Sequence, residues 1–575
     1  MSSSINGWYK LSVFSFSVFA ALYFQIAWQY PVVDGFPLAE RMIDSSFNPS
    51  DFYTNTFTDY SPRFIVANFY IIGANLFNVH YTEFIAYANI IRIFVTFIAI
   101  FYLYTGLIKD KKVALIAFFI SSLCFMQIPK MLAWWPIVYD LTGASVADGA
   151  LMISWALILY KRMFLAYIAL ALAMLFHPVA GIHGFIIGLI LYLSRSDFKS
   201  LMNEFKLWKT YVGVIFICAG FFINYILYLQ SLDGFKLDDA TFLNIIVNFR
   251  HPHHYLPSHF DIEVVISFIV FALSFLYMWN QVKEYLYNKK IVTLVVFYSV
   301  SMMIIGWLFT EVFPTRLAAS IIPFRGFSIL IPIYMLVLAY FMHEKLMDKK
   351  YLSFLLLTLP FMPYNSVGLT WYLLPNSHEM VLPTIILVIV FSIIVANDLK
   401  PKYFNIFNRP LTILLSNSNF YKTIAVSSVF CVLFAIFRFS VFIPDFNNSP
   451  AIYKWLSENT TTSDIIVTEL YAASNQKIRL LSKRPVVISK DFPFLEKYYL
   501  EWYERYKDVY VIQKNSRGYI DKRSSEDLNV LLDKYNASIL LRTIALDSID
   551  HFELIGRAEG EKSEVLIYKN ISLVR

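Results

Sequence analysis

The fold is decided by an uncharged apolar run and by the loop that directly follows it. The run reads Leu11-Ser-Val-Phe-Ser-Phe-Ser-Val-Phe-Ala-Ala-Leu-Tyr-Phe-Gln-Ile-Ala-Trp28, and the loop begins Pro31-Val-Val-Asp34-Gly-Phe-Pro-Leu-Ala-Glu40-Arg-Met. A bilayer is crossed by about 20 mostly apolar residues in a helix. The sequence therefore predicts a first transmembrane helix whose far end leads straight to an acid, Asp34, at the boundary between membrane and water.

The composition extends this prediction to most of the chain. The 575 residues are 58% hydrophobic and 15% charged, with a net charge of +7 and a mean hydropathy of +0.56. Soluble domains carry about 25% charged residues. We therefore expect a polytopic membrane protein. The modest positive charge is explained by basic cytoplasmic loops and does not indicate a nucleic-acid partner.

Apolar runs along the chain predict about thirteen transmembrane helices. The run Phe64–Asn78 is left out because its length is only about 22 Å at 1.5 Å per residue, short of the roughly 30 Å of a bilayer core. We expect it to lie along the outer membrane surface. The spans are placed at residues 11–28, 84–108, 113–128, 146–160, 163–176, 179–193, 211–230, 263–279, 291–309, 326–342, 351–363, 381–397 and 421–442.

The distribution of basic residues orients these spans. About twenty Lys and Arg fall in the loops on one side and about seven in the opposite loops, and the richer side is cytoplasmic by the positive-inside rule. The N-terminus is then cytoplasmic. We expect a transmembrane domain at residues 1–445, with external loops 29–83, 231–262 and 310–325. Residues 446–575 are polar with mixed helix and strand patterns, which predict an external soluble α/β domain.

The first external loop carries the leading catalytic candidate. A carboxylate at Asp34 is suited to act as a general base that takes a proton from an acceptor hydroxyl or amine, or to hold a divalent cation. The alternative is an ordinary solvated loop acid. Three further residues of this loop are expected to support the site, Glu40, Asp59 and Arg63. For Glu40 a solvated helix face is the favoured interpretation.

The second candidate is a loop dense in histidine, Arg250-His-Pro-His253-His254-Tyr255. Imidazoles bind metals or phosphate, and the guanidinium of Arg250 matches phosphate oxygens. No cysteine accompanies them, so a structural zinc site is not indicated, and the metal is left open. The alternative is a polar loop whose histidines have no ligand.

Cations at the outer helix ends form the third candidate group. An arginine at membrane depth is costly unless it faces an anion or a cavity. Arg316 and Arg325 flank the loop 313–327, and Arg92 begins the span 84–108. The alternative is snorkelling to lipid headgroups. His177, which precedes Pro178 at a predicted helix break, is a weaker candidate because a packing role would also explain it.

This organisation resembles the GT-C superfamily of glycosyltransferases, which includes protein O-mannosyltransferases, aminoarabinose transferases and oligosaccharyltransferases. The matching elements are Asp34, the surface run Phe64–Asn78, Arg92 at the head of the next span, and the external domain. The usual Asp-Glu pair of the superfamily is Asp34-Gly35 here, which removes the second acid. The Arg-x-Pro-His-His-Tyr loop resembles that of uncharacterised bacterial membrane proteins.

The resemblance implies an inverting glycosyltransferase in a bacterial inner membrane. The donor would be a sugar on a polyprenyl phosphate, used on the external side together with membrane lipids. Asp34 would activate the acceptor, and the arginines with His253 or His254 would neutralise the leaving phosphate. No nucleotide is expected, since the chain has no phosphate-binding glycine motif. The oligomeric state and the acceptor stay open.

Three other functions fit part of the pattern. A polysaccharide polymerase or ligase would also use lipid-linked sugars and external cations. A solute transporter or lipid flippase would need charges in the middle of its spans and internal repeats, and the sequence shows few of the first and none of the second. A scaffold would use only the external domain. For an enzyme, we expect the three external loops to meet at one cavity.

Overall fold

The computed structural model describes most of the chain. The described residues are 3–27, 36–57, 63–124, 141–195, 203, 206–232, 235–250, 252–260, 262–283, 288–327, 329–348, 350, 353, 356–357, 385–386, 388–394, 419–438, 446–447, 449–469, 472–489, 491–513, 516–519 and 523–572. They divide into two compact units. Unit 1 contains Met1–Gln29, Tyr87–Phe222 and Ile246–Val441, and unit 2 contains Tyr30–Ala86, Ile223–Ile245 and Phe442–Arg575.

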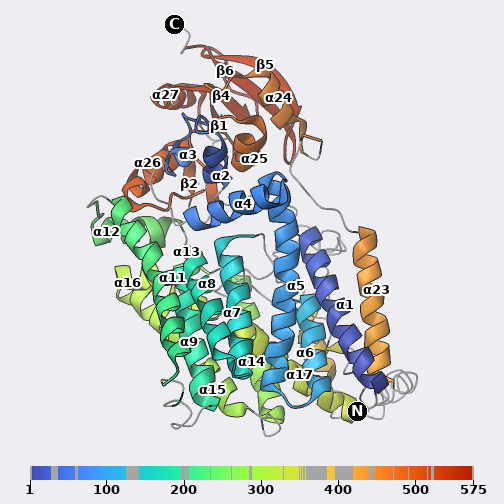
Figure 1. Cartoon of the computed structure of the whole chain (residues 1–575). Helices are drawn as coiled ribbons and strands as arrows, with labels where there is room; N and C mark the ends of the chain where they lie inside the picture. Colours follow the sequence, from blue (N-terminus) through green and yellow to red (C-terminus); the bar gives the residue numbers. More distant parts are fainter. Residues whose placement is uncertain are drawn as a thin grey trace. The chain divides into compact units, whose positions relative to one another are not determined.

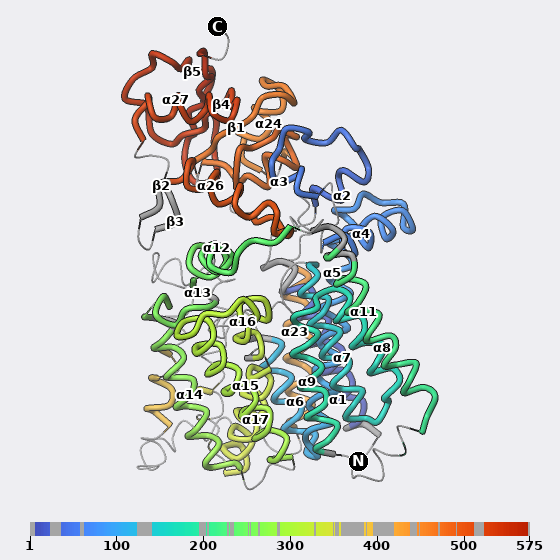
Figure 2. The backbone as a smooth tube through the Cα atoms, turned by 90° about the vertical axis from the view of Figure 1, so that its left-hand side faces the viewer, coloured from blue at the N-terminus to red at the C-terminus, as the bar shows by residue number. Residues whose placement is uncertain are grey.

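Unit 1 is a bundle of apolar helices that run roughly parallel to one another (Figures 1 and 2). In sequence order the long helices are α1 (Ser3–Ala27), α5 (Tyr81–Leu107), α6 (Lys111–Cys124), α7 (Gly143–Leu159), α8 (Met163–Phe176), α9 (Pro178–Arg195), α11 (Trp208–Leu232), α14 (Ile262–Val282), α15 (Lys289–Trp307), α17 (Leu330–Met347) and α23 (Phe420–Arg438).

Short helical turns connect several of these helices. They are η2 (Asn244–Arg250), α13 (Pro252–Tyr255), η3 (Pro257–His259), η4 (Leu308–Val312), α16 (Arg316–Ile321) and η5 (Pro323–Phe327). Both η2 and η4 are π-helical turns. Such turns are rare and often occur near functional sites. Most of the predicted candidate residues of unit 1 lie on these connections.

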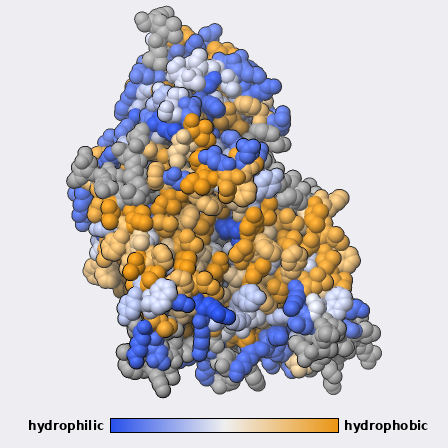
Figure 3. Space-filling model, in the orientation of Figure 1, coloured by the Kyte–Doolittle hydropathy of each residue, from blue (hydrophilic) through white to orange (hydrophobic). Residues whose placement is uncertain are grey.

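The outer faces of the bundle are apolar, as a bilayer requires. In Figure 3 the visible face of the bundle is hydrophobic, and hydrophilic side chains gather toward its end near the N-terminus. Six helical segments of the described residues are long and apolar enough to cross a membrane, namely Tyr81–Leu107, Trp208–Ile226, Val265–Val282, Lys289–Val312, Pro323–Met347 and Phe420–Phe437. The prediction of an integral membrane protein is confirmed. The count of thirteen spans stays a prediction, because residues 358–384 lie outside the described part.

Helix ends in unit 1 follow the local sequence. Thr142 and Ser145 form a capping box that begins α7, with each side chain satisfying a backbone N–H that the helix leaves open. The predicted break at His177-Pro178 is present, since α8 ends at Phe176 and α9 begins at Pro178. Helices α7, α8 and α9 pack against one another, and η5 packs on α9 and α15.

Unit 2 combines segments that are far apart in the sequence. From the first external loop come α2 (Phe36–Ile43), α3 (Phe52–Asn55) and α4 (Phe64–Phe77), and from the loop before η2 comes α12 (Asp239–Leu243). The C-terminal part adds the helical elements α24 (Ala451–Asn459), α25 (Asn475–Lys477), η8 (Ile478–Ser482), η9 (Glu496–Tyr498), α26 (Tyr499–Val509) and α27 (Ser525–Lys534).

The C-terminal part of unit 2 is an α/β structure, as the sequence predicts. One sheet has the strand order β1-β4-β6-β5, and β2-β3 is a separate hairpin. The pair β1 and β4 is parallel, and β6 pairs antiparallel with β4 and β5. Outside these strands, Val486 makes a single parallel bridge to Ile466. The strands are β1 (Ile465–Thr468), β2 (Val511–Gln513), β3 (Ser516–Tyr519), β4 (Ala537–Arg542), β5 (Phe552–Glu559) and β6 (Glu564–Asn570).

Candidate functional site

The break between α8 and α9 brings two predicted residues together in unit 1. Pro178 has no N–H for a continuous helix, so the chain leaves the helix at His177 (φ −154°, ψ 89°). Nη1 of Arg325, from η5, lies 2.7 Å from Nε2 of His177. The two residues are 148 positions apart in the sequence, and the fold makes them direct neighbours.

The hydrogen bonds of His177 cannot all be satisfied at once. The backbone N–H of Ala180 points at Nδ1 over 3.1 Å, while the guanidinium of Arg325 points at Nε2. A neutral imidazole has one N–H and one lone pair, so one of these contacts must set a donor against a donor. An oxyanion beside Arg325 and His177 would accept from both and would remove this conflict.

A buried carboxylate lies within electrostatic range of the same arginine. Asp148 of α7 is 7% exposed, and its carboxyl group interacts with the charges of Arg325 and Arg92. Gly149 permits this arrangement, because a Cβ there would lie 2.7 Å from Oγ1 of Thr96 on α5. The predicted span 146–160 already contained Asp148, and the capping box extends α7 back to Gly143, so Asp148 lies within the helix.

Arg92 is fixed by contacts of its own. Its Nε donates to Oδ1 of Asn89 over 2.9 Å, and Nη1 donates to the carbonyl oxygen of Ser145 over 3.2 Å. The second bond joins α5 to the first turn of α7. The guanidinium therefore stays near Asp148 and does not extend toward lipid headgroups.

Tyr255 connects the histidine-rich loop to the same cluster. Its hydroxyl donates to the carbonyl oxygen of Ala319 over 3.0 Å, and its own carbonyl oxygen accepts from Oγ1 of Thr310 over 2.6 Å. Burial raises the pKa of the Tyr255 hydroxyl, and the positive charges of Arg250 and Arg325 oppose that shift. Arg250 and Arg325 therefore both act on one buried hydroxyl. Three arginines and one buried acid give this region an excess of positive charge.

The turn before Arg325 is held under strain. Ile322 has φ 50° and ψ 72°, a left-handed conformation that costs a β-branched residue about 1–3 kcal/mol. His183 of α9 supports the turn, since one ring nitrogen lies 3.3 Å from the carbonyl oxygen of Ile321 and the other 2.7 Å from the hydroxyl of Tyr298. Strain that the surrounding packing maintains is typical of functional sites.

An apolar groove lies beside the residue that precedes Arg325. It has a volume of about 390 Å³, and Phe324 is one of its walls. Gly306 of α15 allows the wall to form, because a Cβ there would lie 2.9 Å from the Phe324 ring. The other residues that line the groove come from η3, α14 and α15 and from their ends: Pro257, Phe260, Val265, Phe268, Met303, Ile304 and Trp307.

Two supporting candidates belong to unit 2. Glu40 is 8% exposed, and its Oε1 accepts from the hydroxyl of Tyr81 over 2.6 Å. The favoured interpretation of a solvated face was therefore wrong, because Tyr81 provides a buried partner. Arg63 precedes α4, and its guanidinium lies 4.4 Å from the ring centre of Phe494. Both residues stabilise the first external loop in this structure.

The remaining candidates are only partly placed. Arg316 is the first residue of α16. His253 and His254 lie on the turn α13, and their side chains are outside the described part. Asp34 and Asp59 are outside it as well, so the convergence of the three external loops stays a prediction. Among the described residues no group of three or more His, Cys, Asp or Glu could hold a metal ion.

Sequence reasoning missed the charged network of unit 2 that contains Arg479, Asp51 and Asp491. It also missed the apolar groove. The first joins residues 428 positions apart, and the second is formed by four separate elements, η3, α14, α15 and η5.

Comparisons with known proteins identify little of the chain by sequence. Residues 447–509 match the model of a domain of unknown function, DUF6798. A search of curated proteins finds no match. The family match covers the start of the C-terminal α/β part only and therefore does not classify the whole chain.

A search of solved structures finds similar chains at low sequence identity. The oligosaccharyltransferase of Archaeoglobus fulgidus in the apo form has a TM-score of 0.40 at 11% identity, covering 92% of this chain and 69% of that one. ArnT from Cupriavidus metallidurans bound to undecaprenyl phosphate has a TM-score of 0.38 at 12% identity, covering 89% and 88%. With TM-scores below 0.5, neither assigns an activity to this chain.

Proposed function

We propose that this chain is an integral membrane glycosyltransferase of the GT-C type. It takes a sugar from a polyprenyl-phosphate-linked donor and transfers it to an acceptor on the external face of a bacterial plasma membrane. Its N-terminus is cytoplasmic and its C-terminal domain is external. The observation that carries the proposal is the contact of Arg325 with His177, whose conflict between two donors an anion bound beside the pair would remove.

The charge of the cluster in unit 1 supports a phosphate as this anion. Arg325 offers a planar fork of donors that matches phosphate oxygens. Arg92 and Arg250 add positive charge, and Asp148 opposes only part of it. These three arginines are half-buried, and cations among membrane helices are costly unless an anion is present. A phosphate that enters from the membrane surface would offset this cost.

The apolar groove supports a lipid carrier for the phosphate. Phe324, in the wall of the groove, directly precedes Arg325 in the sequence. A single lipid would therefore place its tail in the groove and its phosphate at the guanidinium. The groove is lined by carbon-rich side chains, which suits an isoprenoid chain. A free sugar or a soluble phosphate has no apolar chain that would bind in this groove.

The proposed reaction needs one proton acceptor and one stabilised leaving group. The acceptor oxygen or nitrogen forms a bond to C1 of the sugar while the bond from C1 to the phosphate oxygen breaks. Asp34 takes the acceptor proton, as the sequence predicts. The polyprenyl phosphate leaves with the electron pair, and Arg325 and His177 stabilise its charge.

The test compares two lipids that differ only in the phosphate. Undecaprenyl phosphate and undecaprenol are added to the purified protein in detergent, and binding is measured by native mass spectrometry. We expect a preference of at least about tenfold for the phosphate, which is 1.4 kcal/mol. The preference should be lost in His177→Ala and kept in Arg557→Ala, which changes an exposed arginine of β5. Equal binding of both lipids would contradict a phosphate site.

A further inference from the structure

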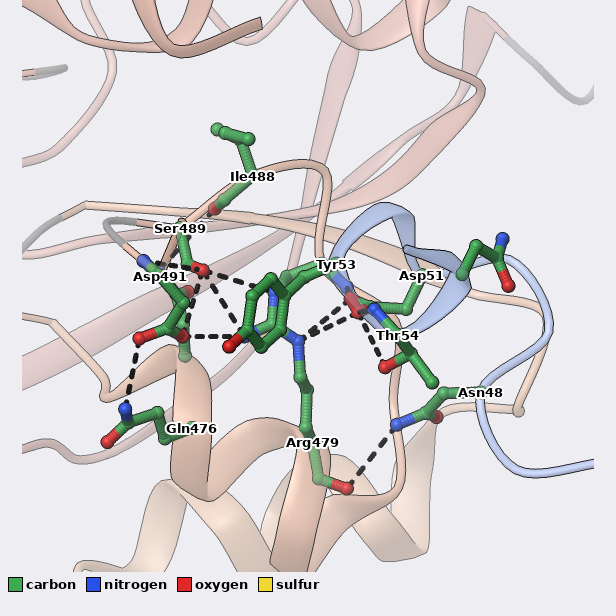
Figure 4. Close-up of polar contacts among 12 residues, drawn as sticks. Asn48, Asp51, Tyr53, Thr54, Gln476, Arg479, Ile488, Ser489 and Asp491 are labelled. Atoms are coloured by element: carbon green, nitrogen blue, oxygen red, sulfur yellow. Dashed lines mark hydrogen bonds and ion pairs between the residues drawn. The ribbon is translucent and has the colours of Figure 1, made fainter. Parts of the chain in front are cut away.

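Unit 2 contains a buried network of charged side chains (Figure 4). Arg479 of η8 is 0% exposed. Its Nε donates to both carboxylate oxygens of Asp51 over 2.9 Å, and its Nη1 donates to Asp491 over 2.9 Å. Both Nη atoms also lie within 3.3 Å of Oγ of Ser489. Burial lowers the pKa of Arg479, but the two carboxylates outweigh it and raise the pKa overall.

Asp51 belongs to the first external loop, and each of its carboxylate oxygens accepts at least two hydrogen bonds. One carboxylate oxygen accepts from the backbone N–H and the hydroxyl of Thr54, over 2.9 and 2.8 Å, and so caps the N-terminus of α3. The other accepts from the backbone N–H of Val486 over 3.1 Å. The same carboxylate thus orders its own loop and attaches that loop to the C-terminal domain.

Such a network is an inefficient way to stabilise a fold. Taking three charges out of water is expensive, and well-packed apolar side chains often do as well. What a buried charged network does provide is one defined arrangement, because any shift leaves a charge without its partner. Tyr53 further restricts the position of Arg479, since the centre of its ring lies 5.0 Å from the guanidinium carbon.

Hydrogen bonds connect the segment that Asp51 anchors to helix α2, which follows the predicted base Asp34 in the sequence. Arg41 of α2 donates from Nη2 to Oδ1 of Asn55 over 2.6 Å and from Nε to the carbonyl oxygen of Phe47 over 3.2 Å. Helix α2 is therefore tied to the segment that Asp51 anchors. It begins at Phe36, two residues after Asp34.

A second external segment is held by the same domain. Oε1 of Glu496, which is 1% exposed, accepts from the backbone N–H of Leu237 over 2.5 Å. The rings of Phe242 and Tyr499 add a contact with centres 6.2 Å apart. Phe242 lies on α12, and η2, which follows α12 directly in the sequence, ends at Arg250.

We propose that the C-terminal domain is a positioning element for sugar transfer. Arg479 and Glu496 are its positioning residues, and they fix the two external segments that lead to Asp34 and to Arg250. The inference rests on the proposed function. The domain touches neither the donor phosphate nor the reacting atoms in this scheme. If the domain no longer fixes these segments, kcat should therefore fall, and the affinity for the lipid phosphate should stay unchanged.

The test uses two neighbouring cations of the full-length protein. Arg479→Gln breaks the network, whereas Lys477→Gln is a matched control, because Lys477 is 4% exposed and pairs over 3.0 Å with Glu561 inside the domain. We expect Arg479→Gln to lower kcat by about 10²-fold, the typical effect of a small misplacement. Binding of undecaprenyl phosphate and the kcat of Lys477→Gln should stay at the wild-type level.

Hydrogen exchange provides a readout that does not need activity. Amides of residues 36–57 should exchange faster in Arg479→Gln and at the wild-type rate in Lys477→Gln. Unchanged exchange, or an equal loss of kcat in both variants, would overturn the positioning role. If the wild-type protein transfers no sugar, the proposed function fails, and the exchange result alone still decides whether the domain holds the loop.

A second pair of variants covers the case in which Arg479→Gln does not fold. Glu496→Ala releases Leu237, and Glu469→Ala is the control, since the described contacts of the Glu469 side chain are with Thr543 within the same domain. Faster exchange over 235–245 together with a lower kcat is expected in Glu496→Ala alone. Wild-type kcat in a folded Glu496→Ala protein would refute the role of this second contact.

Discussion

Replacing Arg325 by alanine removes the guanidinium that lies 2.7 Å from His177 and acts on Asp148 and Tyr255. In the proposed complex this group makes charge-assisted hydrogen bonds to the donor phosphate. One such bond contributes about 1.5–3 kcal/mol. At 1.4 kcal/mol for each factor of ten, the affinity for undecaprenyl phosphate should fall by about 10- to 150-fold.

The lysine variant refines this prediction. Arg325→Lys keeps the charge and loses the planar fork, so its affinity should lie between those of wild type and Arg325→Ala. Binding is measured by native mass spectrometry at several lipid concentrations, with Arg557→Ala as the control. Affinity of Arg325→Ala within a factor of about two of wild type, less than 0.5 kcal/mol, would refute the assignment of this arginine to the phosphate.

Three further outcomes are expected. Asp34→Asn should lower the transfer rate by about 10²–10⁴-fold, because an amide accepts no proton, and a rate above about a tenth of wild type would exclude a general base. Val265→Trp should fill the apolar groove and weaken binding of undecaprenyl phosphate but not of a short-chain analogue, whereas equal weakening of both would exclude the groove as the tail site. Burial raises the pKa of Asp464, but hydrogen bonds from Thr461 and Ser538 lower it overall. The ionised Asp464 should therefore stabilise β1 above a pH of about 3.9, and this stabilisation should be lost as the pH falls below that value. The measurement compares hydrogen exchange of β1 in the wild type and in Asp464→Asn. A difference between the two proteins that stays constant from pH 3 to 6 would contradict this.

Helices in unit 1 could be predicted because a membrane span depends on a local property. Length and apolar character determine it, so the expected spans and the observed α5, α7, α14 and α15 agree to within a few residues at most ends. The break at His177-Pro178 was predictable for the same reason, since proline acts on its own helix. The mixture of helices and strands in the C-terminal part was likewise predictable from local patterns.

Part of the candidate site followed from the cost of charge in a membrane. Arg325 and Arg92 were chosen because arginines need a partner at that depth, and the fold does bring Arg325 to His177, which was chosen for its place at the predicted helix break. Their exact partners were not predictable. The contacts depend on the close approach of helices at Gly149 and on the strained turn at Ile322, which no local pattern reports.

The network of unit 2 was beyond sequence reasoning. Asp51 was one of several acids in a loop, and Arg479 was one basic residue among many in the C-terminal domain. Nothing local distinguishes an acid that will be buried against an arginine 428 positions away from one that stays in water. Glu40 was misjudged for the same reason, because its partner Tyr81 begins a different helix.

The most direct test of the central claim is the identity of the lipid that purifies with the protein. The Asp34→Asn variant and the wild type are purified from the native membrane in mild detergent, and bound lipids are identified by mass spectrometry. The account predicts a sugar-bearing polyprenyl phosphate on the variant and its sugar-free form on the wild type. Only phospholipids on both proteins, with no exchange for added polyprenyl phosphate, would contradict it.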